Sequence, residues 1–186
     1  MKELTNYRGE FNPNIKYGDF SKDFLLGLLN GYAGYVMRVD AFWYLTVKDR
    51  NDDDEALACD MAVWDKALYY ELGMTSKLFQ IKGNDVATVM KLIQMSPFQW
   101  TRDFKFTIEL KDSNHSIFTV IHCPMLLGLE KEGEGREQRI CHIMEPKMFG
   151  MIAHYVNPEI KVQPIKLPPR KSQDEIACQW EFKLDR

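Results

Sequence analysis

Three cysteines in the last third of the chain are the residues best suited to chemistry. They are Cys123, Cys141 and Cys178, and the acid Glu145 follows the second of them by four residues. A thiolate attacks electrophilic carbon and also binds borderline metals, and both uses require a lowered thiol pKa. Cys123 ends a predicted strand, Cys141 precedes a predicted helix and Cys178 lies in a predicted strand, so sheet pairing could bring the three sulfur atoms together.

Cys141 is the strongest candidate nucleophile of this set. It stands just before a predicted helix start and is flanked by Arg139 and His142, so backbone N–H groups and positive charge would favour its thiolate. Glu145 or a histidine would then move the proton. The alternative is that all three cysteines are buried thiols that pack like small hydrophobic residues.

A metal site is a second use of the same residues. The cysteines supply three ligands, and the fourth would be His122, His142 or Glu145, among which the spacing does not choose. Zinc is the one cofactor that these residue types suggest. The predicted metal ligands are Cys123, Cys141, Cys178 and His142. The chain has no Cys-x-x-Cys pair, which removes the usual signal of a zinc ribbon.

Acids close to tryptophans form a second group of candidates. Asp40 with Trp43, and Asp60 with Trp64 and Glu71, lie in segments with helical spacing. Carboxyl groups under aromatic rings form a polar pocket in which burial raises their pKa toward general acid and base use. The predicted ligand contacts are Asp40, Trp43, Trp64 and Cys178. The alternative is that Asp40 caps a helix and that the other two acids are solvated.

Composition and charge exclude several functional classes. The 186 residues include 24 Lys plus Arg and 27 Asp plus Glu, and the net charge of −3 argues against a protein that coats nucleic acid. The longest apolar run, residues 24–29, is far shorter than the roughly 20 residues of a membrane-spanning helix. The polar start lacks an export-signal pattern, so we expect a cytoplasmic protein with free thiols, including Cys59 in the core.

The first half of the chain has helical periodicity and the second half changes to strand periodicity. After an arm over residues 1–20, apolar residues recur every three or four positions, and Gly73 is a candidate helix break. The predicted helical segments are residues 22–38, 40–47, 55–80, 84–95 and 145–155. The predicted strands are residues 104–110, 116–122, 159–166 and 175–184, with a charged glycine-bearing loop over 130–135.

These elements predict one α+β domain over residues 21–186. Its helical N-terminal half would pack on a four-stranded, mainly antiparallel C-terminal sheet. In the last strand, alternate residues from Ile176 to Leu184 form an apolar face that includes Cys178.

Several short motifs resemble those of an uncharacterised prokaryotic domain family. That family is similar in turn to L-2-amino-thiazoline-4-carboxylate hydrolase-like proteins and, more distantly, to vinyl-4-reductase (4VR) domains. The C-terminal motifs are His122-Cys123-Pro124, Cys141 with Glu145, residues 157–160, Pro168-Pro169 and residues 178–182. Residues 40–47 and 60–64 resemble its two segments of acid and aromatic residues, and the resemblance covers residues 22–184.

The resemblance implies roles for the cysteines. The hydrolase-like relatives keep three cysteines at places that match Cys123, Cys141 and Cys178, whereas the 4VR relatives hold zinc with cysteines and a glutamate. Here Gln163 and Leu167 occupy the region of the other zinc ligands, so the resemblance implies an incomplete zinc site and favours the hydrolase-like branch. The chain also departs from the family at three positions. It has Ala41, Lys48 and Leu167 where the family has a glycine, an acid and a cysteine, respectively.

From these features we expect a small-molecule-binding, hydrolase-like protein that acts on a small C–N or thiazoline-type compound. Cys141, Cys123 and Glu145 are its predicted catalytic residues. The alternative is a non-enzymatic sensor that binds a small molecule and whose cysteines are structural. We expect no nucleic-acid or membrane partner, and a homodimer is compatible with the sequence.

Overall fold

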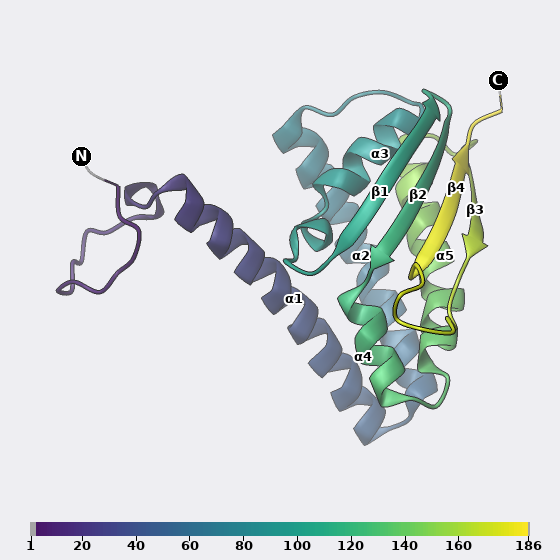
Figure 1. Cartoon of the computed structure of the whole chain (residues 1–186), viewed down its shortest axis with the longest axis horizontal. Coiled ribbons are helices and arrows are strands. Elements are labelled where there is room, and N and C mark those ends of the chain that lie inside the picture. The colour runs from purple at the N-terminus through teal and green to yellow at the C-terminus, as the bar shows by residue number, and fades with distance from the viewer. Residues whose placement is uncertain (1–2, 186) are drawn as a thin grey trace.

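The chain folds into helices that cover one face of an antiparallel sheet (Figure 1). The computed structural model describes residues 3–185, so residues 1 and 2 of the predicted arm and residue 186 of the predicted domain lie outside the described range. The sheet has four strands in the order β1-β2-β4-β3, and every neighbouring pair is antiparallel. The predicted α+β class is confirmed.

A single long helix, α1 (Lys22–Arg50), replaces the two helical segments predicted over residues 22–47. The Ser21 side chain caps its start by accepting a hydrogen bond from the Phe24 backbone N–H at 3.3 Å. The separation predicted near residue 39 is absent because residues 35–50 contain no glycine or proline that would stop the helix.

The second and third helices agree with the predicted segments. α2 (Asp53–Phe79) begins after Asp52, whose carboxylate accepts from the Glu55 N–H at 2.8 Å, and ends at the left-handed Gln80. The break predicted at Gly73 is wrong, since buried neighbours such as Leu72 hold this part of the helix against the protein. α3 (Val86–Met95) follows, and the short 3-10 helices η1 (Tyr17–Asp19) and η2 (Pro97–Trp100) precede α1 and β1.

The predicted hairpin is confirmed as β1 (Lys105–Asp112) and β2 (His115–His122). After it the structure departs from the prediction. A helix that was not predicted, α4 (Pro124–Glu132), follows directly, and α5 (Arg136–Val156) begins nine residues before its predicted start. Gly133 and Gly135, both with positive φ, make the turn between the two helices, so the charged loop occupies fewer residues than expected.

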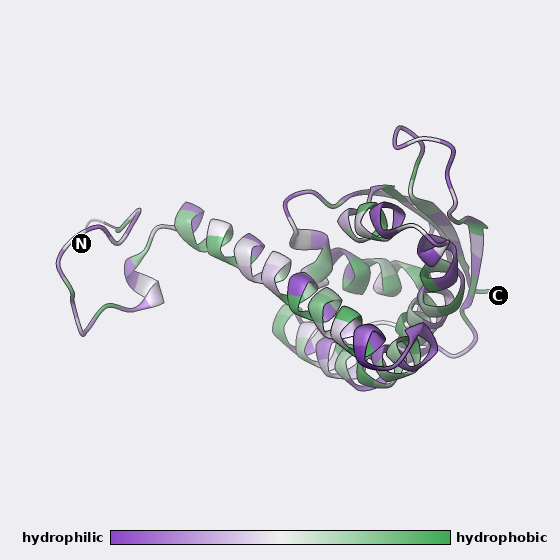
Figure 2. Cartoon of the chain, turned by 90° about the horizontal axis from the view of Figure 1, so that it is seen from below, coloured by the Kyte–Doolittle hydropathy of each residue, from purple (hydrophilic) through white to green (hydrophobic). Residues whose placement is uncertain are grey.

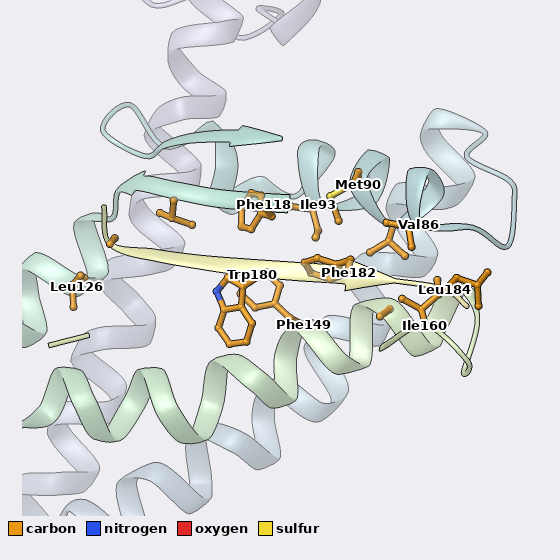
Figure 3. Packing of buried hydrophobic residues seen from close by; sticks show 14 residues of the cluster. Val86, Met90, Ile93, Phe118, Leu126, Phe149, Ile160, Trp180, Phe182 and Leu184 are labelled. Carbon is orange, nitrogen blue, oxygen red and sulfur yellow. The ribbon is translucent and has the colours of Figure 1, made fainter. Parts of the chain in front are cut away.

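The two final strands complete the sheet and the core. β3 (Lys161–Lys166) is an edge strand and tolerates Pro164, while β4 (Cys178–Lys183) lies between β3 and β2. The core fills the space between this sheet and α3 and α5 (Figure 3). Phe149 of α5 packs against Trp180 of β4 with ring centroids 4.8 Å apart.

The N-terminal half of α1 projects away from the sheet and the other helices, and the N-terminal segment lies at its far end (Figures 1 and 2). This segment folds back on the start of α1 rather than on the sheet. Leu4 donates its N–H to Asp19 O, and Ser21 donates its N–H to Leu4 O, each at 2.8 Å. Within residues 3–185, no helix is long and apolar enough to cross a membrane.

Candidate functional site

A cavity of about 740 Å³ lies where the helices meet the sheet. All five α-helices contribute lining residues, together with η2, the segment that leads into β1 and residues of β2 and β4. Ile93, Leu126 and Phe149, which are labelled in Figure 3, belong both to the core and to the cavity wall. A volume of this size accommodates a drug-sized organic molecule.

The fold brings Cys123, Cys141 and Cys178 to the wall of this same cavity. Cys123 caps the start of α4, and its Sγ accepts the Leu126 N–H at 3.4 Å. Cys178 Sγ accepts the indole N–H of Trp180 at 3.2 Å. All four cysteines of the chain are free thiols. The fourth, Cys59, is half-buried on α2, where its thiol contacts Glu55, so the prediction that it belongs to the core is wrong.

The three cavity thiols do not have the lowered pKa that thiolate chemistry needs. Burial raises the pKa of Cys123 to about 11, and it raises the pKa of Cys141 and Cys178 as well. The negative charge of Glu145 adds to the upward shift of the pKa at each of the three. The thiols are therefore neutral near pH 7.

The activating environment predicted for Cys141 is wrong. Cys141 lies in the second turn of α5 rather than before a helix start, so the free N–H groups of the first turn do not reach it. The two side chains that flank Cys141 in the sequence also interact elsewhere. Arg139 pairs with Asp54, and the ring of His142 forms a 2.6 Å hydrogen bond between Nε2 and Pro168 O.

A metal site made of Cys123, Cys141, Cys178 and His142 has no support in the structure. Within residues 3–185, no three His, Cys, Asp or Glu side chains are grouped so that they could hold a metal ion. His142 is turned to the Pro168 carbonyl. The other histidine considered, His122, contacts the Asp103 carbonyl. The donor set thus does not fit zinc, which ordinarily takes four ligands in a tetrahedron.

The second group of candidates lies where α1 and α2 pack together. Trp64 of α2 donates its indole N–H to Asp40 Oδ1 of α1 at 3.0 Å. Asp60 lies one turn before Trp64, and only 4% of it is exposed. Both carboxyl groups and the Trp64 ring line the cavity. The alternative that Asp40 caps a helix and Asp60 is solvated is therefore wrong, since Asp40 lies in the middle of α1.

Several carboxyl groups of the cavity hold their protons more tightly than usual. Burial, followed by repulsion from Asp40, raises the pKa of Asp60 to about 7. Burial alone raises the pKa of Glu145 to about 7, and it also raises the pKa of Asp40 and Glu71. Groups of this kind can accept or release a proton near neutral pH.

One predicted ligand contact is misplaced and one lining residue was not predicted. Trp43 is 39% exposed and points away from the cavity, because a helix turns by about 100° per residue and Asp40 and Tyr44 take the inner side. Arg136 at the start of α5 lines the cavity with its guanidinium 4.4 Å from the centre of the Tyr44 ring. No motif marks Arg136, since only the packing of α5 beside α1 gives it this place.

The comparisons with known proteins identify a family for which no activity is described. No curated protein matches the chain, and no solved structure matches it. One family model, described as a family of unknown function, matches residues 18–184. This match names no reaction, so the likeness to thiazoline hydrolases and 4VR domains stays a prediction. By this match the chain belongs to the family of unknown function DUF6125.

Proposed function

We propose that this protein binds a small organic molecule in the cavity between its helices and its sheet. The observation that carries the proposal is the cavity itself, about 740 Å³ in volume, with mainly apolar walls that also include charged side chains such as Asp40, Asp60, Arg136 and Glu145. Sites for small ligands in proteins have this size and composition. Asp40 of α1 and Asp60 of α2 line it together with Glu145 and the three thiols.

Binding without catalysis fits the thiols better than hydrolysis does. In a hydrolase, Cys141 would attack the C–N or thiazoline carbon while Glu145 accepted its proton. The pKa of Cys141 is raised far above the value of about 7 for Glu145, so the proton remains on sulfur. The protein is therefore proposed to be a ligand-binding or sensor module in which the cysteines form part of the wall.

A sensor also needs an element that carries the response. The same helix that lines the cavity through Asp40 and Tyr44 extends well beyond the body of the protein (Figure 1). A ligand held between α1 and α2 would bias the position of α1, provided that it binds one arrangement of the helices better than another.

Hydrolysis is the second candidate function, and Glu145 is the observation that favours it. A carboxyl group with a pKa of about 7 beside three sulfur atoms can hold or release a proton during a reaction. Release of ammonia or of a thiol from a C–N or thiazoline compound by the wild-type chain, but not by Glu145→Gln, would establish this candidate over simple binding.

The binding proposal is tested by filling the cavity. Ala41 of α1 lines the cavity, whereas Ala58 of α2 is exposed and does not. The probe is benzyl alcohol, which is neutral, and saturation-transfer NMR would detect its binding. Wild type and the control Ala58→Trp should give a transfer signal, and Ala41→Trp should lose it. An equal signal from all three proteins, or none from wild type, would overturn the proposal.

A further inference from the structure

Asp60 is a buried carboxylate with an unsatisfied oxygen. Its Oδ1 has no hydrogen-bond partner among the described residues, although only 4% of the residue is exposed and it lines the cavity. A buried acceptor without a partner is costly, and a charged one more so. An unsatisfied buried polar group calls for an explanation, and a bound molecule that completes its hydrogen bonds is one.

The surrounding groups leave negative charge at this wall. Asp40 of α1 approaches Asp60 closely enough to raise its pKa, and the one indole N–H of Trp64 serves both carboxyl groups. Arg38 and Arg102 also line the cavity, but the cation whose charge lowers the pKa of Asp60 is Arg136 of α5. Its guanidinium is shared with the carboxylates of Glu132 and Asp53, so it does not neutralise the pair.

Aromatic rings complete the same wall. Trp64 and Phe98 pack with ring centroids 5.1 Å apart, and Tyr44 and Phe42 also line the cavity. Two carboxylates next to aromatic faces suit an organic cation, because the carboxylates accept its N–H groups and the rings attract its positive charge. An anionic ligand would instead be repelled by both acids.

We infer that the cavity selects a ligand with a protonated nitrogen, such as an organic amine, which Asp40 and Asp60 bind together. This inference rests on the proposed function, since it names the chemical class of the ligand for the same cavity. The amine would supply the hydrogen-bond donor that Asp60 Oδ1 lacks. Its apolar part would occupy the remaining volume toward α4 and α5.

The test compares three probes of similar shape on the full chain at pH 8. Benzylamine is cationic, benzyl alcohol is neutral and benzoate is anionic. Calorimetry should show benzylamine binding at least tenfold tighter than benzyl alcohol, with no binding of benzoate. Asp60→Asn should weaken the binding of benzylamine at least tenfold and leave the affinity for benzyl alcohol unchanged. The control Asp49→Asn alters an exposed acid of α1 outside the cavity and should change neither.

Two results would overturn the inference and separate it from the proposed function. If benzylamine binds no better than benzyl alcohol, or if Asp60→Asn binds it as well as wild type, charge recognition fails while the cavity remains a binding site. If none of the three probes binds at millimolar concentration, the proposed function fails together with the inference.

An independent observation concerns the outer side of α1. Apolar side chains on this side are spaced alternately three and four residues apart, which is the heptad spacing of helices that pair. They are Leu29 (56% exposed), Tyr32 (50%), Val36 (48%), Val39 (47%) and Trp43 (39%). We call this set the α1 seam. It lies opposite the side of α1 that lines the cavity. It begins in the N-terminal half of α1, which stands clear of the body in Figures 1 and 2.

We propose that the α1 seam pairs with the same seam of a second copy of this chain. Apolar residues that repeat every 3.5 positions on average are typical of a helix that packs against another helix. In a two-fold symmetric dimer, the same surface of each copy contacts the other. Each half-exposed aromatic side chain has about 100 Å² of accessible surface that a partner can bury. With the flanking Tyr35, which is 62% exposed, the face offers an area in the range of a small interface, toward the roughly 800 Å² per partner of a standard one.

Sedimentation equilibrium of the full chain tests this pairing. Wild type should be a dimer at micromolar concentration, and Val36→Glu should shift it to monomer by placing a charge in the seam. The control is Val63→Glu on α2, which has nearly the same exposure (46%) and should remain a dimer. A monomeric wild type, or a dimer that Val36→Glu leaves intact, would overturn the proposal.

Discussion

Trp64 donates its indole N–H to Asp40 Oδ1 at 3.0 Å and so joins the two longest helices across 24 residues of sequence. Trp64 is 9% exposed, and its ring packs on Phe98 of η2. Trp64 therefore connects α2 to α1 by a hydrogen bond and to the segment before the sheet by ring packing, at the wall of the cavity.

Removal of this hydrogen bond should destabilise the fold. In Trp64→Phe the ring still packs but Asp40 loses its donor, so the free energy of unfolding should fall by about 1 to 3 kcal/mol. Urea denaturation measures the change. The control is a double-mutant cycle with Asp40→Ala, which removes the acceptor. Strictly additive effects of the two substitutions would show that the bond contributes nothing.

The raised pKa of Asp60 predicts a pH dependence of stability. Its ordinary value of 3.8 applies to the unfolded chain and about 7 to the folded chain, so between these values the folded state binds the extra proton. Stability should therefore fall as pH rises from 4 to 7, by up to about 1.4 kcal/mol per pH unit for this group.

Asp60→Asn isolates this contribution from those of the other acids, because it keeps the size of the side chain and removes its ionisation. The variant should be more stable than wild type at pH 8 by a margin that shrinks toward pH 4. Chemical denaturation at several pH values measures both proteins. A constant difference across this range would contradict the prediction.

The cavity thiols should react slowly. Because burial raises the pKa of Cys123, Cys141 and Cys178, iodoacetamide at pH 8 should alkylate them much more slowly in the folded chain than in urea. Peptide mass spectrometry follows each site separately. Rapid alkylation of Cys141 in the folded chain at pH 7 would restore the hypothesis of a cysteine nucleophile.

Arg170 should be a major contributor to stability. Its side chain is 1% exposed and binds Glu130 of α4 through two hydrogen bonds, Nε to Oε1 at 2.7 Å and Nη2 to Oε2 at 2.9 Å. Lysine keeps the charge but cannot form this paired geometry, so Arg170→Lys should cost about 2 kcal/mol. Thermal unfolding detects the loss. The neighbouring, exposed Lys171→Ala should be nearly neutral.

Local signals in the sequence were sufficient for most elements. The spacing of apolar residues predicted α2, α3, the β1–β2 hairpin and the two final strands, because each of these patterns comes from one buried face. α4 was missed although Cys123 and Pro124 carry the cap and the first-turn proline of a helix. The start of α5 was placed nine residues too late, after the predicted charged loop, whereas the helix begins at Arg136 and continues through Pro146 to the core contacts of Phe149.

The sequence by itself determined the α+β class and the residue types available for chemistry, since periodicity and composition are properties of the chain. Only the tertiary structure decided that Asp60 is buried without a full set of partners, that Cys141 lies inside a helix among neutral thiols, and that Trp43 faces outward. The pKa of a group depends on burial and on charges brought in from other elements, as Asp40 and Glu145 do here. Packing between distant segments creates those surroundings, and no spacing within one segment specifies them.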